Sequence, residues 1–316
     1  MTITDKIDNV TNIPEEYRKA VLPAPHSVKI EISPRCNYRC LFCSLRTREK
    51  QPTEDMDFDL FKRITQEMRD ASVQECGLFF LGESFMNLPL LVECIKWTKS
   101  IGFPYIFLTT NGSLVTKEAA KSVMEAGLDS LKFSIVAADE DQFEYIVGVK
   151  KSLYYKALEN VKGAWEVREE GHYGCQLYAS SIRYDNDQMA KMDAVLDKHI
   201  RPYIDQWYDL PLYGMALFAE QRKKELGYEI TAGNQGRMGN LREPLPCWTV
   251  IREGHVTADG GLSACCFDSN SRWRMADLKK VSFMEGWNSP EFVKLREAHL
   301  KRDISGTICE GCIAYS

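Results

Sequence analysis

Long apolar runs are missing from this sequence, although 44% of its 316 residues are hydrophobic. A membrane-spanning helix needs about 18 consecutive apolar residues, and runs such as 78–81 and 88–92 are far shorter. Residues 1–13 are polar and acidic and lack the apolar centre of a signal peptide. These absences predict a cytoplasmic protein with no membrane segment.

The sequence also lacks an excess of positive charge. Its 40 basic and 45 acidic residues leave a formal net charge of −5, which argues against binding nucleic acid through charge alone. With 27% charged residues, the composition is that of a globular protein rather than a disordered or fibrous one. No internal repeat or low-complexity segment is present.

Cysteine, in contrast, is abundant, with 11 residues. An odd number of cysteines cannot all form disulfides within one chain, and residues 1–13 show no export signal. A full set of disulfides is therefore not expected. In a reducing compartment, such a chain is more often a metal protein or a redox enzyme.

Short apolar runs alternate with longer amphipathic ones over the first two thirds of the chain. They predict strands at 28–32, 76–81, 105–109, 130–135, 175–182 and 204–208. They predict helices at 59–71, 88–100, 117–126, 142–168, 186–198 and 290–301. Strands interleaved with helices favour a parallel sheet. Six such units suit a partial (β/α)6 barrel of the TIM type, because a complete barrel usually needs ~250 residues.

This pattern divides the α/β chain into four segments. An N-terminal extension at 1–26 precedes the partial barrel at 27–210, and a connecting segment rich in glycine and proline follows at 211–246. A small cysteine-rich domain at 247–316 completes the predicted organisation.

The first cysteine cluster is a C-x3-C-x2-C motif made by Cys36, Cys40 and Cys43, directly after the first predicted strand. Three thiols this close together on a loop indicate a metal site, and soft thiolates suit zinc or an iron–sulfur cluster. Structural zinc takes four ligands. Three ligands leave one iron of a [4Fe–4S] cluster open to bind a small molecule, and a zinc knuckle is the alternative.

The motif and its position resemble those of the radical S-adenosylmethionine (SAM) superfamily. The resemblance implies that the three cysteines hold a [4Fe–4S] cluster whose open iron binds S-adenosylmethionine, with Phe42 on the adenine side. Leu81-Gly82-Glu83-Ser84 is similar to the Gly-Gly-Glu-Pro motif of the family, although its first and last positions differ. Gly82 and Glu83 would then hold the methionine ammonium.

Two further positions match the family pattern. Thr109-Thr110-Asn111-Gly112 resembles its Thr-Asn-Gly turn, which makes Asn111 a cofactor contact or simply part of a tight turn. Ser134 ends the fourth predicted strand, where relatives carry a serine that contacts the methionine carboxylate. The alternative for Ser134 is a buried strand residue.

A second cysteine cluster lies near the C-terminus. Cys247, Cys265, Cys309 and Cys312 resemble the SPASM/twitch extension of this superfamily, in its shorter twitch form. The resemblance implies one auxiliary [4Fe–4S] cluster with four thiolate ligands and no open iron. A zinc ribbon is the alternative, because four separated cysteines also suit tetrahedral zinc.

The adjacent Cys266 has no part in that ligand set. A carbon radical can abstract the hydrogen of an S–H bond, so Cys266 is the candidate catalytic residue, a hydrogen donor of the kind that radical epimerases use. Alternatively it packs as a small hydrophobe, which is the role expected for Cys76, Cys94 and Cys175.

The resemblance implies an enzyme that abstracts hydrogen from a polar small-molecule substrate, with a flavodoxin- or ferredoxin-type reductant as partner. Epimerisation of a carbohydrate or aminoglycoside-like molecule is the first expectation, and oxidation of an aminocyclitol or sugar alcohol is the second. Peptide modification ranks third, because residues 1–26 are too few for a peptide-recognition domain. A non-catalytic iron–sulfur or zinc scaffold is the remaining alternative.

Overall fold

The computed structural model describes residues 2–43, 45, 51–184, 187–211, 245–268, 273–310 and 312. The connecting segment predicted at 211–246 lies outside the described residues except for 211, 245 and 246.

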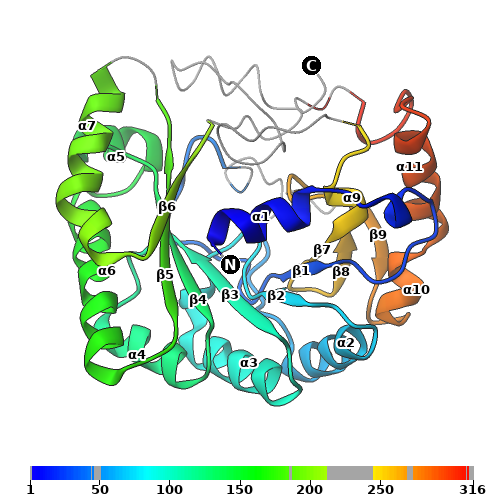
Figure 1. Ribbon diagram of the computed structural model, residues 1–316, viewed down its shortest axis with the longest axis horizontal. Helices are drawn as coiled ribbons and strands as arrows, with labels where there is room; N and C mark the ends of the chain where they lie inside the picture. The colour runs from blue at the N-terminus through cyan, green and yellow to red at the C-terminus, as the bar shows by residue number, and fades with distance from the viewer. Residues whose placement is uncertain are drawn as a thin grey trace.

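Within these residues, the strands form one nine-stranded sheet in the order β6-β5-β4-β3-β2-β1-β7-β8-β9 (Figure 1). The first six strands are mutually parallel and follow one another along the chain. They are β1 (Ser27–Ile30), β2 (Glu75–Gly77), β3 (Tyr105–Thr110), β4 (Ser130–Ile135), β5 (Gln176–Ile182) and β6 (Gln206–Leu210). This arrangement confirms the predicted partial barrel.

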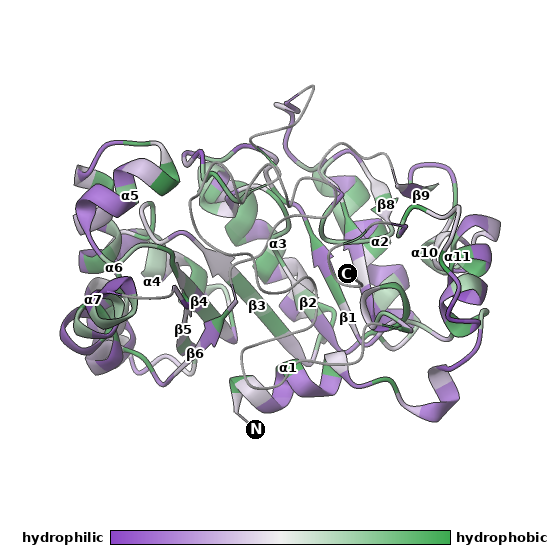
Figure 2. Cartoon of the chain, turned by 90° about the horizontal axis from the view of Figure 1, so that it is seen from above, coloured by the Kyte–Doolittle hydropathy of each residue, from purple (hydrophilic) through white to green (hydrophobic). Residues whose placement is uncertain are grey.

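Helices cover the outer face of the curved sheet (Figure 2), and their buried apolar residues belong to the hydrophobic core. They are α2 (Phe58–Asp70), α3 (Leu88–Ser100), α4 (Lys117–Glu125), α5 (Glu140–Val147), α6 (Ser152–Gly171) and α7 (Asp187–Val195). The Asp57 side chain caps α2, and the Thr116 side chain caps α4.

Two predicted elements are wrong in extent. The helix expected at 142–168 is two helices, because the chain turns into the left-handed conformation at Gly148, with φ of 69°. The strand expected at 76–81 ends at Gly77, and the chain then bends into a loop that carries Gly82 and Glu83.

The cysteine-rich segment continues the barrel sheet. Its strand β7 (Glu253–Val256) pairs parallel with β1, and β8 (Gly261–Ser263) and β9 (Arg274–Asp277) follow antiparallel. Its helices are α9 (Thr249–Arg252), α10 (Phe283–Trp287) and α11 (Pro290–Leu300). This parallel pairing joins strands that are more than two hundred positions apart in sequence.

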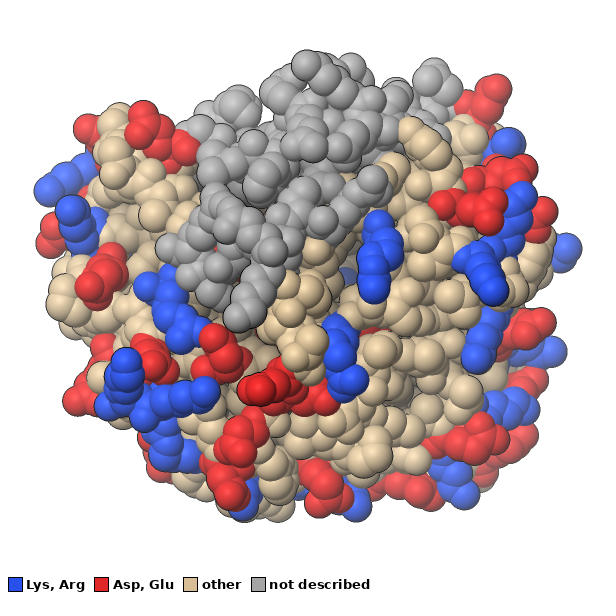
Figure 3. Space-filling view, turned by 180° about the vertical axis from the view of Figure 1, so that it is seen from behind, with Lys and Arg blue, Asp and Glu red and all other residues tan. Residues whose placement is uncertain are grey.

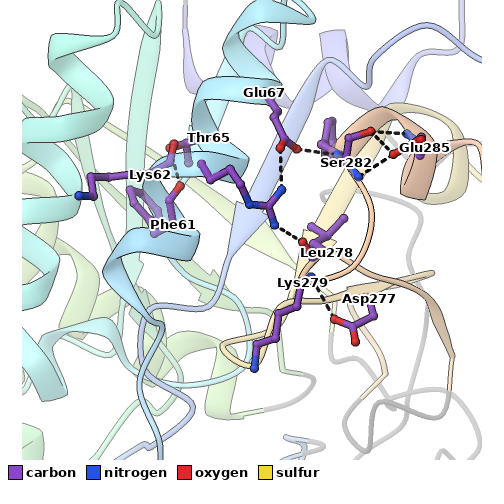
Figure 4. A network of polar contacts seen from close by, with 11 residues as sticks. Phe61, Lys62, Thr65, Glu67, Asp277, Leu278, Lys279, Ser282 and Glu285 are labelled. Atoms are coloured by element: carbon purple, nitrogen blue, oxygen red, sulfur yellow. Dashed lines mark hydrogen bonds and ion pairs between the residues drawn. The ribbon is translucent and has the colours of Figure 1, made fainter.

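Polar contacts connect the C-terminal cysteine-rich segment to α2 (Figure 4). The Glu67 carboxylate accepts a hydrogen bond from the backbone N–H of Phe283 at 2.7 Å. It also pairs with the Arg63 guanidinium at 2.6 Å, and Arg63 donates to the carbonyl of Leu278. Ser282 caps α10 with a capping box that includes Glu285.

The N-terminal extension forms helix α1 (Ile3–Thr11), which crosses the concave side of the sheet (Figures 1 and 2). The backbone N–H of Ile3 donates to the Gln206 side chain on β6 at 2.6 Å. At its other end, Arg252 of α9 donates to the carbonyl of Asn9 at 3.3 Å. Helix α1 therefore bridges the two sides of the open barrel, and a cavity of about 200 Å³ lies between it and the strands. We call this the barrel cavity.

The described surface carries both signs of charge. On the face in Figure 3, acidic and basic side chains are interspersed. Among the described residues, none of the helices combines the length and the apolar character that crossing a membrane requires.

Candidate active site

The C-x3-C-x2-C loop follows β1 at the carboxyl end of the parallel strands. Cys36, Cys40 and Cys43 together line a cavity of about 360 Å³, with Arg35 and Arg39 beside them. We call this the cysteine cavity. In the described part of the chain, no three His, Cys, Asp or Glu side chains converge at the distances of a single metal ion. The three thiols do line one cavity, and this arrangement suits a cluster of several irons.

The pKa shifts of the cysteine thiols also favour an iron–sulfur cluster at this site. Burial raises the pKa of the Cys36 thiol to about 12, and the negative charge of Glu83 raises it further. Burial raises the pKa of Cys40 well above its usual value, and the neighbouring thiols Cys43 and Cys36 add to this effect. Three thiolates here are costly without positive charge among them, and iron supplies that charge. The donor set therefore fits a [4Fe–4S] cluster.

The loop after β2 lies against the backbone that leads into the cysteine motif. A Cβ atom at Gly82 would lie only 1.9 Å from the carbonyl oxygen of Ser33, so the position requires glycine. The backbone N–H of Glu83 donates to the carbonyl of Arg35 at 2.8 Å. This close approach is the physical reason for the retained Gly-Glu pair.

The Glu83 carboxylate is buried and held by three hydrogen bonds. It accepts from the backbone N–H of Asn111 at 2.8 Å, the hydroxyl of Thr110 at 3.0 Å and the N–H of Phe85 at 3.3 Å. Burial raises its pKa, and these hydrogen bonds partly oppose the rise. A fixed, buried carboxylate of this kind fits the ammonium group that the family motif implies.

Asn111 joins this carboxylate to the cysteine loop. Its amide donates to the Asn37 side chain at 2.9 Å and points toward the Cys36 sulfur at 4.0 Å. Ser134 on β4 is half-buried and lines a small cavity with Asn111. Phe42 lies inside the motif, between Cys40 and Cys43, and is partly buried against the core. The predicted cofactor contacts therefore lie in the loops after β1, β2 and β3 and, for Ser134, at the end of β4.

Replacing Gly82 by alanine should therefore displace the loop and lower both stability and S-adenosylmethionine binding. Overpacking of this kind costs about 1–3 kcal/mol, measurable as a lower urea midpoint. Gly174→Ala is the control, because a Cβ atom there meets nothing within 4 Å. Equal behaviour of the two variants would contradict the close approach.

The structure also brings together the C-terminal cysteines. Cys247 is buried, and its charge would raise the pKa of both Cys265 and Cys309. Cys312 acts in the same way on Cys309. The contact with Cys266 has the largest effect on the pKa of Cys265, and burial has the largest effect on the pKa of Cys309.

Cys266 is partly buried and lies beside Cys265. It is close enough to Lys29 of β1 to influence that ammonium. The expected packing of Cys76, Cys94 and Cys175 is confirmed, because all three are buried.

Sequence reasoning missed a buried charged group inside the barrel. The Lys29 ammonium lies 2.9 Å from the Glu253 carboxylate, and His255 Nε2 lies 3.0 Å from the same carboxylate. Lys29 and Glu253 also line the barrel cavity, with aromatic side chains such as Phe79, Tyr105 and Trp248. Lys29 and His255 stand opposite each other in the β1–β7 register, which the local sequence pattern does not reveal.

Two acidic residues on and beside β6, Asp205 and Asp209, are not free to bind a positively charged substrate. Asp205 pairs with Arg168 at 2.6 Å, and Asp209 pairs with Arg183 at 2.8 Å. Their charges are therefore compensated. Tyr213 and Glu220, part of the same stretch, lie outside the described residues.

Family models match two regions of the chain. The Radical SAM superfamily model matches residues 30–173, and the SPASM model, an iron–sulfur cluster-binding domain, matches residues 247–313.

Solved structures share the fold. BtrN in complex with AdoMet and 2-DOIA superposes with a TM-score of 0.58 at 14% identity, covering 92% of this chain and 94% of that one. Streptococcus suis SuiB bound to S-adenosylmethionine gives a TM-score of 0.66 at 13% identity, covering 93% and 72%.

Among curated relatives, a probable GTP 3′,8-cyclase of Saccharolobus solfataricus is 29% identical over 142 residues. The match covers 44% of this chain and 44% of the relative, so the chain spans less than half of that protein. Taken with the site geometry, the two family matches identify the cofactors as S-adenosylmethionine, a [4Fe–4S] cluster and auxiliary iron–sulfur chemistry. The chain belongs to the radical SAM superfamily and carries a C-terminal SPASM domain.

Proposed function

We propose that this radical SAM enzyme epimerises a carbon centre of a carbohydrate or aminoglycoside-like molecule and that Cys266 donates the hydrogen atom. The observation that carries the proposal is the position of Cys266. It stands next to Cys265, outside the set of four C-terminal cysteines, and close to Lys29 inside the barrel. A thiol in this place would be near a substrate held beside Lys29, which lines the barrel cavity.

The barrel cavity supports a hydroxylated substrate. Aromatic side chains, among them Phe79, Tyr105 and Trp248, offer apolar surface to the C–H faces of a sugar ring. Lys29 and Lys132 supply polar groups along the same wall, and the Lys132 ammonium donates to the Tyr208 hydroxyl at 3.0 Å. Residues of helix α1 form one wall of this cavity.

The chemistry then divides between cofactor and chain. When bound, S-adenosylmethionine and its cluster supply a 5′-deoxyadenosyl radical that takes one hydrogen atom from the substrate. Cys266 returns a hydrogen atom to the opposite face of that carbon. The sulfur radical left on Cys266 then needs one electron and one proton to regenerate the thiol. We infer that a flavodoxin- or ferredoxin-type protein supplies the electrons.

Oxidation of a substrate alcohol is the second candidate, and the Lys29–Glu253–His255 group favours it. Burial lowers the pKa of His255, and the Glu253 carboxylate beside it opposes this effect in part. A neutral imidazole can accept the proton that an alcohol loses as it becomes a ketone, while the 5′-deoxyadenosyl radical would take one hydrogen atom and the auxiliary cluster would take the remaining electron.

The test is Cys266→Ala in deuterated water. A panel of sugars, amino sugars, aminocyclitols and short peptides is first screened for substrate-dependent 5′-deoxyadenosine. The wild-type enzyme should place one solvent deuterium in the product. Cys266→Ala should still form 5′-deoxyadenosine but lose the epimerised product, by at least about a hundredfold if the donor is essential.

Cys266→Ser is the matched variant, because it keeps the size of the side chain but its O–H bond is too strong to donate a hydrogen atom. It should fail as the alanine variant does. If both variants keep full product formation and wild-type product carries no deuterium, epimerisation through Cys266 is refuted and oxidation becomes the leading function.

A further inference from the structure

His299 connects two of the four C-terminal cysteines. It lies near the end of α11, and its side chain is fully buried, with 0% of its surface exposed. The backbone N–H of Cys247 donates to its Nδ1 at 3.2 Å. On the other side of the ring, Nε2 lies 3.3 Å from the Cys309 sulfur.

These contacts fix the tautomer. A nitrogen that accepts a hydrogen bond carries no hydrogen, so the single ring hydrogen is on Nε2. Nε2–H is therefore directed at the Cys309 sulfur as a donor.

Helix α11 holds the ring in this orientation. The Arg296 guanidinium, one turn before His299, donates to the carbonyl of Val250 at 2.9 Å and to that of Ala20 at 3.3 Å. It also stacks on Trp287. The helix is therefore anchored to the segment that follows Cys247, and the imidazole bridges Cys247 and Cys309 from a rigid position.

We propose that His299 is a positioning residue of the auxiliary iron–sulfur cluster, whose N–H···S hydrogen bond to Cys309 raises the reduction potential of that cluster. The inference rests on the proposed ligand set of Cys247, Cys265, Cys309 and Cys312.

The physical reason is that reduction adds negative charge to the cluster and its thiolates. A hydrogen-bond donor aimed at a ligand sulfur stabilises the reduced state more than the oxidised state. The effect is strong where water is excluded, because the local dielectric constant is low. Only five histidines occur in the chain, and this one places a donor at a sulfur that two distant segments bring together.

The experiment uses the full chain with Cys36, Cys40 and Cys43 replaced by alanine, so that only the auxiliary cluster remains. The cluster is reconstituted anaerobically, and its iron content and midpoint potential are measured for three changes at position 299. His299→Leu removes both contacts. His299→Asn keeps a partner for the Cys247 N–H but is too short to reach Cys309, and His299→Gln restores a donor at the position of Nε2.

We expect all three variants to retain about four irons. The midpoint potential should become more negative in His299→Leu and His299→Asn and stay near that of the unchanged protein in His299→Gln. Equal potentials in all variants would overturn the proposal. Loss of iron from the Leu and Asn variants would also overturn it, by making His299 a ligand or a structural residue. The deuterium experiment with Cys266 is independent, so failure of the proposed function is recognised separately.

Discussion

Replacing Cys36, Cys40 and Cys43 together by alanine should abolish reductive cleavage of S-adenosylmethionine and lower the iron content from about eight to about four atoms per chain. The three thiols line one cavity, and the Glu83 carboxylate and Asn111 converge on the same loop. Without these ligands, the cofactor has no iron to bind and no source of the electron that breaks its carbon–sulfur bond.

The measurement is iron and sulfide per chain after anaerobic reconstitution, with 5′-deoxyadenosine formation as the second readout. The control replaces Cys76, Cys94 and Cys175, which removes the same number of thiols from buried positions away from the cysteine cavity. The control should keep all its iron. A fall from about four irons to none in the triple variant would instead show that the C-terminal cysteines hold no cluster and would remove the basis for the role of His299.

Local sequence predicted the parts of the fold that depend on local physics. The alternation of apolar strands and amphipathic helices gave the six parallel units, and the contiguous cysteine motif indicated the first cluster without any knowledge of contacts. Errors occurred where one residue changes the backbone. Gly148 adopts a left-handed conformation that divides a long helical pattern, and the strand pattern at 76–81 stops at Gly77, before a loop in which Ser33 leaves no room for a side chain at Gly82.

The remaining features depend on contacts between distant residues. Glu253 meets Lys29 because β7 joins β1, and the two residues are 224 positions apart. Cys247 and His299 are 52 positions apart. A histidine inside a helix gives no local sign of a sulfur partner, and a glutamate at the start of a short strand gives no sign of burial. Such partners become visible only when the sheet order is known.

Replacing Glu253 by alanine should give the largest loss of stability among single substitutions in the barrel. Lys29, whose side chain is 20% exposed, would lose the carboxylate 2.9 Å away, and removing one partner of a largely buried ion pair costs up to about 3–5 kcal/mol. The measurement is urea unfolding at pH 7. The control is the double variant Lys29→Met, Glu253→Leu, which should recover most of the loss, because apolar residues of similar size often replace a buried pair at little cost.

The same pair should make the stability depend on pH in a defined direction. Burial by itself raises the pKa of Glu253, but Lys29 and then His255 outweigh it and lower the pKa to about 2 from 4.5. A lowered carboxyl pKa stabilises the fold above the unfolded value, and the stabilisation is lost as the pH falls from 4.5 toward 2.

For Lys29, burial lowers the pKa, but Glu253 outweighs it and the net change is upward from 10.5. Its stabilisation is therefore complete below pH 10.5 and is lost only as the pH rises beyond that value. The unfolding free energy of the wild type minus that of the double variant should stay constant between these limits and decrease on the acid side below pH 4.5. A difference that does not change with pH would mean that the pair is not ionised in the folded protein, and Lys29 would then offer a substrate no fixed positive charge.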